Sequence, residues 1–168
     1  VQTCALPISL YLVDQYQEFI DSTKRKFPME YRNRLRGYTV GVTEDDDTDI
    51  SFLPDNQFGL IFAYNYFNYK PIELIKRYLD EITGKLRPGG MFIMTYNDCD
   101  RSHAVALAEQ KFMCYTPGKH IQRYAESLGL EIIYTHVGAG DLTWIELRKP
   151  GEITSLRGGQ ALAKILPK

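Results

Sequence analysis

Two carboxylates occupy positions from which they could accept hydrogen bonds from a bound ligand. Asp14 follows the apolar run Ser9–Val13, and Asp49 stands directly before Ile50. A carboxylate at the end of a strand can accept hydrogen bonds from two neighbouring hydroxyl groups, although Asp14 could equally cap a following helix. Asp49 could accept from an amino group while Ile50 supplies a backbone amide and an apolar surface. Alternatively, Asp49 is one more acid of a solvated loop.

A small residue and a tyrosine end the apolar run that begins at Phe58, namely Ala63 and Tyr64. A small side chain and exposed carbonyl oxygens at a strand's end allow a cation to approach closely, and the Tyr64 ring could add a cation–π contact. Tyr64 could instead stack in an aromatic cluster, because further aromatic residues follow between positions 66 and 69.

The elements that must position these residues can be read from the spacing of apolar residues. Continuous apolar runs indicate strands buried on both faces of a sheet, and a period near 3.6 indicates helices. We expect strands at Ser9–Val13, Leu35–Val42, Phe58–Ala63, Met91–Tyr96, Glu131–Val137 and Leu142–Arg148. We expect helices at Gln17–Phe27, Pro71–Lys85, Ala104–Lys111 and Thr116–Leu128. The alternation predicts an α/β fold with an open, mostly parallel sheet and helices on both faces.

Local signals set several boundaries of these elements. Pro71 suits the first turn of a helix, and Pro88–Gly90 indicates a turn before the next strand. Thr116 is the expected N-cap of the last helix and Gly129 its C-terminal stop. The glycine-containing segment 138–141 predicts that the last two strands form an antiparallel hairpin.

Together, several of these segments resemble the class I S-adenosylmethionine-dependent methyltransferases. The resemblance extends from about Leu10 to Leu147 and rests on short motifs in the right succession. These are Asp14, Asp49-Ile50 with Leu53-Pro54, the strand entry Asp55–Ile61, the turn Leu86-Arg87-Pro88-Gly89-Gly90, and the final third from Tyr115 to the hairpin. The resemblance implies a Rossmann-like sheet in the order 3-2-1-4-5-7-6 and S-adenosylmethionine as the cofactor.

The resemblance also implies roles for the residues introduced above. Asp14 would bind the ribose hydroxyl groups, and Asp49 and Ile50 would bind adenine. Ala63 and Tyr64 would lie beneath the sulfonium of the methyl donor. No catalytic residue can be assigned, because methyl transfer is an in-line displacement on an activated carbon and alignment with desolvation can suffice.

Two departures from the family's pattern concern the cofactor site and the strand entry. Gly59 stands where an aspartate is usual. The glycine-rich loop that follows the family's first strand is missing, so we expect the first βα unit to be missing and the sheet to be interrupted between Ser9–Val13 and Phe58–Ala63. We interpret residues 1–8 as a translated sequencing adapter, residues 9–149 as a partial methyltransferase domain and residues 150–168 as a C-terminal tail. This truncated fragment would be inactive.

Composition limits the partners and the compartment of the protein. The 168 residues carry a net charge of -1, without a long basic run, so neither a nucleic-acid surface nor a membrane surface is indicated. The three cysteines show no paired spacing, which favours a reducing, cytoplasmic setting. The acidic segment 44–47 is typical of a solvated loop, and we expect no metal site.

Three functions remain open at this point. The first is methyl transfer to an unidentified acceptor, in which the residues at the end of the fourth expected strand, Tyr96 to Asp98, could contact substrate or cap the next turn. The second is a non-catalytic Rossmann-like interaction or assembly module. The third is a nicotinamide-dependent oxidoreductase, which explains neither the Leu53-Pro54 turn nor a terminal antiparallel hairpin.

Overall fold

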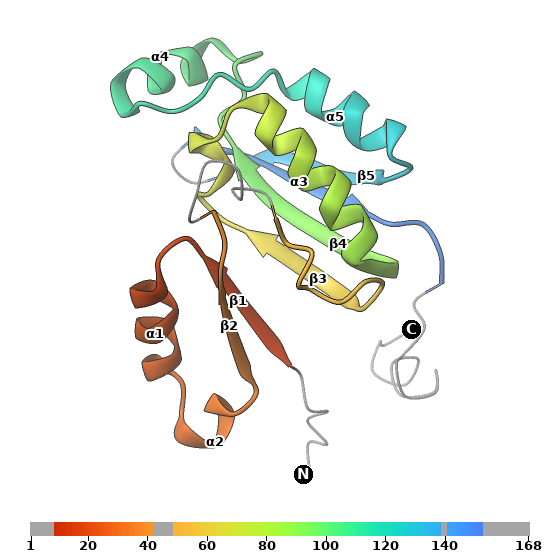
Figure 1. Ribbon diagram of the computed structural model, residues 1–168. Coiled ribbons are helices and arrows are strands. Elements are labelled where there is room, and N and C mark those ends of the chain that lie inside the picture. Colours follow the sequence, from red (N-terminus) through yellow and green to blue (C-terminus); the bar gives the residue numbers. More distant parts are fainter. Residues whose placement is uncertain (1–8, 42–48, 139–140, 153–168) are drawn as a thin grey trace, which may run out of the picture. The chain divides into compact units, whose positions relative to one another are not determined.

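The computed structural model describes residues 9–41, 49–138 and 141–152 (Figure 1). The chain divides into two compact units, Val1–Phe52 and Leu53–Lys168. The segments 1–8, 42–48 and 153–168, which contain the suspected adapter, the acidic run and most of the basic tail, lie outside the described residues.

The first unit is a βαβ arrangement in which two parallel strands are joined through helices. Its elements are β1 (Leu10–Asp14), α1 (Gln17–Lys26), α2 (Met29–Arg32) and β2 (Leu35–Thr39). The register places Asp14 opposite Thr39, so both strands end together. Helix α1 covers the pair with the buried Ile20, and Gly37 of β2 permits this approach because a Cβ there would collide with Ile20 Cγ2.

The second unit is built on a four-stranded sheet. Its elements are β3 (Phe58–Ala63), η1 (Phe67–Tyr69), α3 (Ile72–Lys85), β4 (Leu86–Tyr96), α4 (Ser102–Lys111), α5 (Gly118–Ser127), β5 (Glu131–Val137) and β6 (Thr143–Arg148). The strand order is β3-β4-β6-β5. β3 and β4 are parallel, whereas β6 is antiparallel to both of its neighbours. The predicted terminal hairpin is therefore confirmed.

The core of the second unit lies between one face of this sheet and two helices. Phe92 and Met94 of β4 are fully buried, as are Ile75 of α3 and Ile121 of α5. The Phe67 ring joins this core through edge contacts to Tyr78 of α3 and to Phe92, with ring centroids 5.3 and 6.0 Å apart. Burial of several such side chains, each worth about 1.5–3 kcal/mol, is the main contribution that holds α3 and α5 on the sheet.

The structure corrects three local predictions. Strand β2 ends at Thr39 rather than Val42, which lies outside the described residues. Strand β4 begins at Leu86, directly after α3, and the predicted turn at Pro88–Gly90 is a bulge within it. Gly89 has a φ of 72°, which accounts for the glycine there.

The third correction concerns the start of α5. Its N-cap position is Pro117 and no side chain at that position caps the helix, so the prediction for Thr116 is wrong. The first amides of α5 are instead bound by two carboxylates that follow β4: Asp98 accepts from Gly118 and Asp100 accepts from Lys119, each at 2.9 Å. Thr116 is buried against Asp98 through an isolated parallel bridge.

Strands β1 and β3 belong to different sheets, in agreement with the interruption expected between them. Among the residues that the structure describes, no helix is both long and apolar enough to cross a membrane.

Candidate functional site

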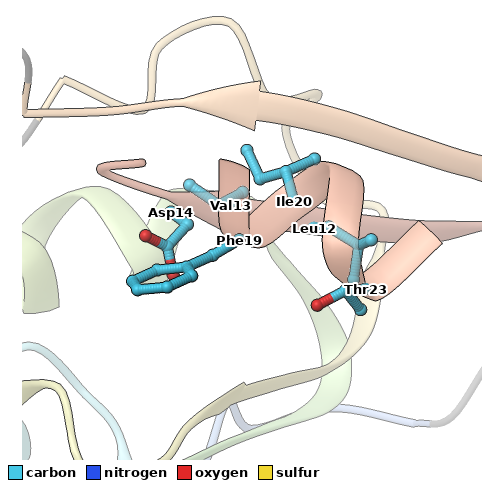
Figure 2. Close-up of a pocket in the computed structure, with 6 residues that line it drawn as sticks. All are labelled: Leu12, Val13, Asp14, Phe19, Ile20 and Thr23. Atoms are coloured by element: carbon cyan, nitrogen blue, oxygen red, sulfur yellow. The ribbon is translucent and has the colours of Figure 1, made fainter. Parts of the chain in front are cut away.

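Asp14 lies at the carboxyl end of β1, on the rim of a small hollow in the first unit (Figure 2). The hollow has a volume of about 100 Å³ and is lined by Leu12, Val13, Asp14, Phe19, Ile20 and Thr23. Pockets that enclose a whole small molecule are usually about 300–1,000 Å³. The hollow is therefore too small to enclose a whole small molecule, and Asp14 and the exposed Phe19 are among the residues that line it.

The Asp14 carboxylate already takes part in the turn that leads into α1. Its Oδ1 accepts a hydrogen bond from the backbone amide of Tyr16 at 2.9 Å, and Tyr16 is the residue at the N-cap of the helix. Asp14 is therefore not the N-cap of α1, because Tyr16 holds that position, and the Asp14 carboxylate instead fixes the turn before the helix. An ionised carboxylate offers about four acceptor positions, so this contact leaves Asp14 able to accept from ligand hydroxyl groups as well.

Asp49 and Ile50 directly precede a turn at Ser51 and Phe52, and Phe52 fixes this turn against β2. Asp49 Oδ1 accepts from the Ser51 amide at 2.9 Å, and Phe52 stacks on Tyr38 with ring centroids 4.9 Å apart. Asp49 is exposed, whereas the Ile50 side chain is only 4% exposed. The carboxylate is therefore accessible to a ligand, and the Ile50 side chain is packed within the protein.

Ala63 and Tyr64 lie at the carboxyl end of β3, in the second unit. The Tyr64 side chain is 53% exposed and its ring contacts Phe62 and Trp144, with centroids 6.5 and 5.7 Å apart. The rings of Tyr66 and Phe67 pack instead with Tyr78 of α3. The consecutive aromatic residues thus separate into two clusters, and Tyr64 keeps an exposed surface.

A residue that the sequence reasoning did not single out directs the chain away from β3. Asn65 has a left-handed backbone with a φ of 56°, and its amide donates to Thr95 Oγ1 at 2.8 Å. Its side-chain oxygen accepts from the amide nitrogen of Asn68, a fully buried residue. Asparagine tolerates the left-handed region better than most residues. The residue type at position 65 was therefore the one local indication of this turn in the sequence.

At the end of β4, the side chains of Asn97 and Asp98, which were expected as possible substrate contacts, form hydrogen bonds within the protein. The Asn97 side chain is buried and donates to the backbone oxygens of Ala104 and Cys114 at 2.9 and 3.4 Å. Asp98 is buried and binds the start of α5. Burial and the charge of Asp98 raise the pKa of Tyr96, so its phenol is protonated at neutral pH and is not a general base.

Two thiols beside this region are also held in their neutral form. Burial, together with the charges of Asp100 and Asp98, raises the pKa of Cys99. Burial raises the pKa of Cys114. Because the thiolate is the nucleophile, neither thiol is activated for covalent chemistry.

The residues described above fall into two groups, and in each group one residue ends a parallel strand, namely Asp14 for β1 and Ala63 for β3. Asp14, Asp49 and Ile50 belong to the first unit, and Ala63 and Tyr64 belong to the second. In open α/β sheets, ligands bind at these strand ends.

All five of these residues lie within residues 2–94, which match a family model described as a methyltransferase domain. The chain belongs to this family. The match covers more than half of the chain. The strand order β3-β4-β6-β5 corresponds to the 4-5-7-6 half of the class I methyltransferase sheet, and the pair β1-β2 corresponds to its strands two and three. The predicted fold class is thereby confirmed.

Solved structures with the same fold include several methyltransferases. One belongs to the complex between the Haloferax volcanii Trm112 methyltransferase activator and a methyltransferase; it is 14% identical, with a TM-score of 0.64 over 88% of this chain and 75% of that one. The N-methyltransferase NodS from Bradyrhizobium japonicum, solved with S-adenosyl-L-homocysteine, is 13% identical, with a TM-score of 0.57 over 84% and 67% of the two chains.

A possible exported protein from Bordetella parapertussis is 12% identical, with a TM-score of 0.62 over 85% of this chain. This chain spans about half of that protein, 54% of its length. A search among curated proteins found no match.

Proposed function

We propose that this methyltransferase-family chain carries the nucleoside side of an S-adenosylmethionine site, and that the whole protein transfers a methyl group to an acceptor. The observation that carries the proposal is the position of Asp14, at the carboxyl end of a parallel strand and on the rim of a hollow. The NodS structure, which contains S-adenosyl-L-homocysteine, supports the same ligand class.

In this proposal the acidic residues of the first unit select the nucleoside. Asp14 accepts from the ribose hydroxyl groups with the positions that the Tyr16 amide leaves available. Asp49, which is exposed, accepts from the adenine amino group. Because the Ile50 side chain is buried, its backbone amide is the part that would donate to the adenine ring.

Two residues of the second unit, Ala63 and Tyr64, would contact the sulfonium group of the methyl donor. The Ala63 side chain is small, and the exposed Tyr64 ring can make a cation–π contact, worth about 0.5–1 kcal/mol at an exposed site. No side chain is assigned as a base, since alignment of the acceptor with the methyl group can supply most of the rate.

In class I methyltransferases, a glycine-rich loop with the pattern acidic-G-x-G-x-G contacts the methionine part of the cofactor. The 168-residue chain contains no such segment. We therefore propose that this chain alone binds the cofactor weakly and is inactive in methyl transfer. We also propose a reducing, cytoplasmic setting, which agrees with the free thiols of Cys99 and Cys114.

The experiment is a titration of the isotopically labelled chain with S-adenosylhomocysteine, followed by amide chemical shifts. We expect millimolar binding with shifts at Asp14, Asp49 and Tyr64, and its loss in Asp14→Asn. The control is Asp21→Asn, an aspartate of α1 whose contact is to Gln17. Absence of any shift contradicts the nucleoside site, while micromolar affinity contradicts the weak binding of this chain.

The oxidoreductase alternative predicts that a nicotinamide dinucleotide causes the larger shifts in the same titration. The confirmed antiparallel hairpin of β5 and β6 is a feature that this alternative does not explain. An interaction module predicts no shift with either ligand.

A further inference from the structure

The backbone at the end of β3 is held by a side chain of the neighbouring strand rather than by its backbone. β3 and β4 are paired in parallel as far as Ala63 and Met94. Two residues beyond Ala63, the Asn65 amide leaves the ladder and donates to the Thr95 hydroxyl at 2.8 Å. Thr95 is fully buried, so this hydroxyl is not shared with solvent.

The same turn is held from its other side by Asn68. The Asn68 side-chain nitrogen donates to Asn65 Oδ1, and the Asn68 backbone oxygen accepts from the Cys114 amide at 2.7 Å. Asn65 itself is exposed and has a positive φ. A residue in a sparsely populated backbone region persists only when its surroundings determine it, and here a buried hydroxyl and a buried amide do so.

The conformation of Asn65 sets the direction of the residue before it. Tyr64 points toward Trp144 and keeps half of its side chain exposed, whereas Tyr66 turns into the contact with Tyr78. If the amide of Asn65 lost its acceptor, the turn could relax toward an extended backbone and the ring of Tyr64 would lose its fixed position.

We propose that Thr95 is a positioning residue for the donor site: its hydroxyl holds Asn65 in the left-handed turn that presents Tyr64. This inference rests on the proposed function, because it assumes that the methyl donor meets Tyr64. A valine would fit a buried strand position equally well, so the hydroxyl is the informative feature of Thr95.

The test compares variants that separate the contribution of the Thr95 hydroxyl from that of the Thr95 methyl group. Thr95→Val removes the acceptor and Thr95→Ser keeps it. Thr143→Val is the matched control, since Thr143 is a buried strand threonine whose hydroxyl has no hydrogen-bond partner among the described residues. Amide hydrogen exchange of Asn65 should accelerate at least about tenfold in Thr95→Val and change little in the other two variants.

A second readout distinguishes positioning from general support of the core. The chemical shifts of the Tyr64 amide and ring should change in Thr95→Val and stay close to those of the unaltered chain in Thr95→Ser. If Thr95 only fills the core, Thr95→Ser, which loses a methyl group, is the more altered of the two variants, and the proposal is wrong.

The ligand arm uses S-adenosylhomocysteine as the probe on the same variants. We expect its affinity to fall about tenfold or more in Thr95→Val and to stay close to that of the unaltered chain in Thr95→Ser. Normal affinity in Thr95→Val overturns the positioning role while the proposed function stands. If the unaltered chain does not bind the probe, the proposed function and the positioning role of Thr95 are both overturned. This holds even where hydrogen exchange shows that the Thr95 contact holds the turn.

Discussion

The carboxylate of Asp98 accepts a hydrogen bond from the backbone amide of Gly118 at 2.9 Å, although 20 residues separate them in the chain. The same oxygen accepts from the Asp100 amide at 3.0 Å. One buried side chain therefore joins the end of β4 to the first turn of α5, where an anionic group is favoured by the helix dipole.

We predict that Asp98→Ala lowers the free energy of unfolding by about 2 kcal/mol, because two amides lose their acceptor in a buried place. Asp98→Asn keeps one acceptor oxygen and should cost less. Urea denaturation measures both, with Asp100→Asn as an exposed comparison. Equal stability of Asp98→Ala and the unaltered chain would contradict this account of the α5 start.

Two glycines in helices should respond to alanine in opposite directions. A Cβ at Gly118 would collide with the Asp98 carboxylate, whereas a Cβ at Gly84 in α3 would meet no atom within 4 Å. We expect Gly118→Ala to destabilise by about 1–3 kcal/mol and Gly84→Ala to stabilise by about 0.5–1 kcal/mol. Thermal unfolding followed by circular dichroism compares the pair, and a stabilising Gly118→Ala would refute the predicted collision.

Lys149 holds the segment after β6 against the C-terminal end of α3. Its Nζ donates to Asn56 Oδ1, to the Thr83 oxygen and to the Leu86 oxygen at 2.9, 2.8 and 2.9 Å. Lys149→Met keeps the aliphatic chain and removes these donors, so we expect a loss of about 1–3 kcal/mol. Lys111→Met, at the exposed end of α4, should change stability by no more than about 0.5 kcal/mol. The two variants are compared by urea denaturation.

The contact between α3 and α5 should weaken in alkaline solution. Tyr124 donates to Asp80 Oδ1 at 2.9 Å, and this hydrogen bond is the main reason that the pKa of Tyr124 is raised. A raised pKa in the folded state means that the stabilisation is complete below the unfolded pKa, about 10, and is lost as pH rises through the folded value.

The measurement is the difference in free energy of unfolding between the unaltered chain and Tyr124→Phe, followed from neutral to alkaline pH. The difference should be constant near neutrality and shrink in the alkaline range. A difference that grows with pH would show that the phenol is not the donor to Asp80.

The parts of the fold that could be predicted have local signals. Strand β3 is a continuous apolar run, and α3 combines a proline at its start with buried residues at helical spacing, Ile75, Leu79 and Ile82. The hairpin of β5 and β6 follows from two β-rich runs around a glycine-containing turn. In each case the information lies within a few residues of the element.

The parts that could not be predicted depend on partners far away in the sequence. Thr116 looked like an N-cap by its own type, but Asp98 from the preceding strand end binds the helix amides instead. Beyond the nearby Phe62, the Tyr64 ring contacts Trp144, 80 residues later, and the acceptor of the Asn65 amide is Thr95. These hydrogen-bond and ring-contact partners are determined by which side chains the strand order brings together.

Trp144 is the only tryptophan of the chain, and its ring contacts Phe62 on β3, Tyr64 directly after β3 and His136 on β5. Its fluorescence therefore comes from a single cluster of rings contributed by β6, β5 and the end of β3. Changes in its emission would report changes in the ring contacts between the end of β3 and the hairpin, without any added label.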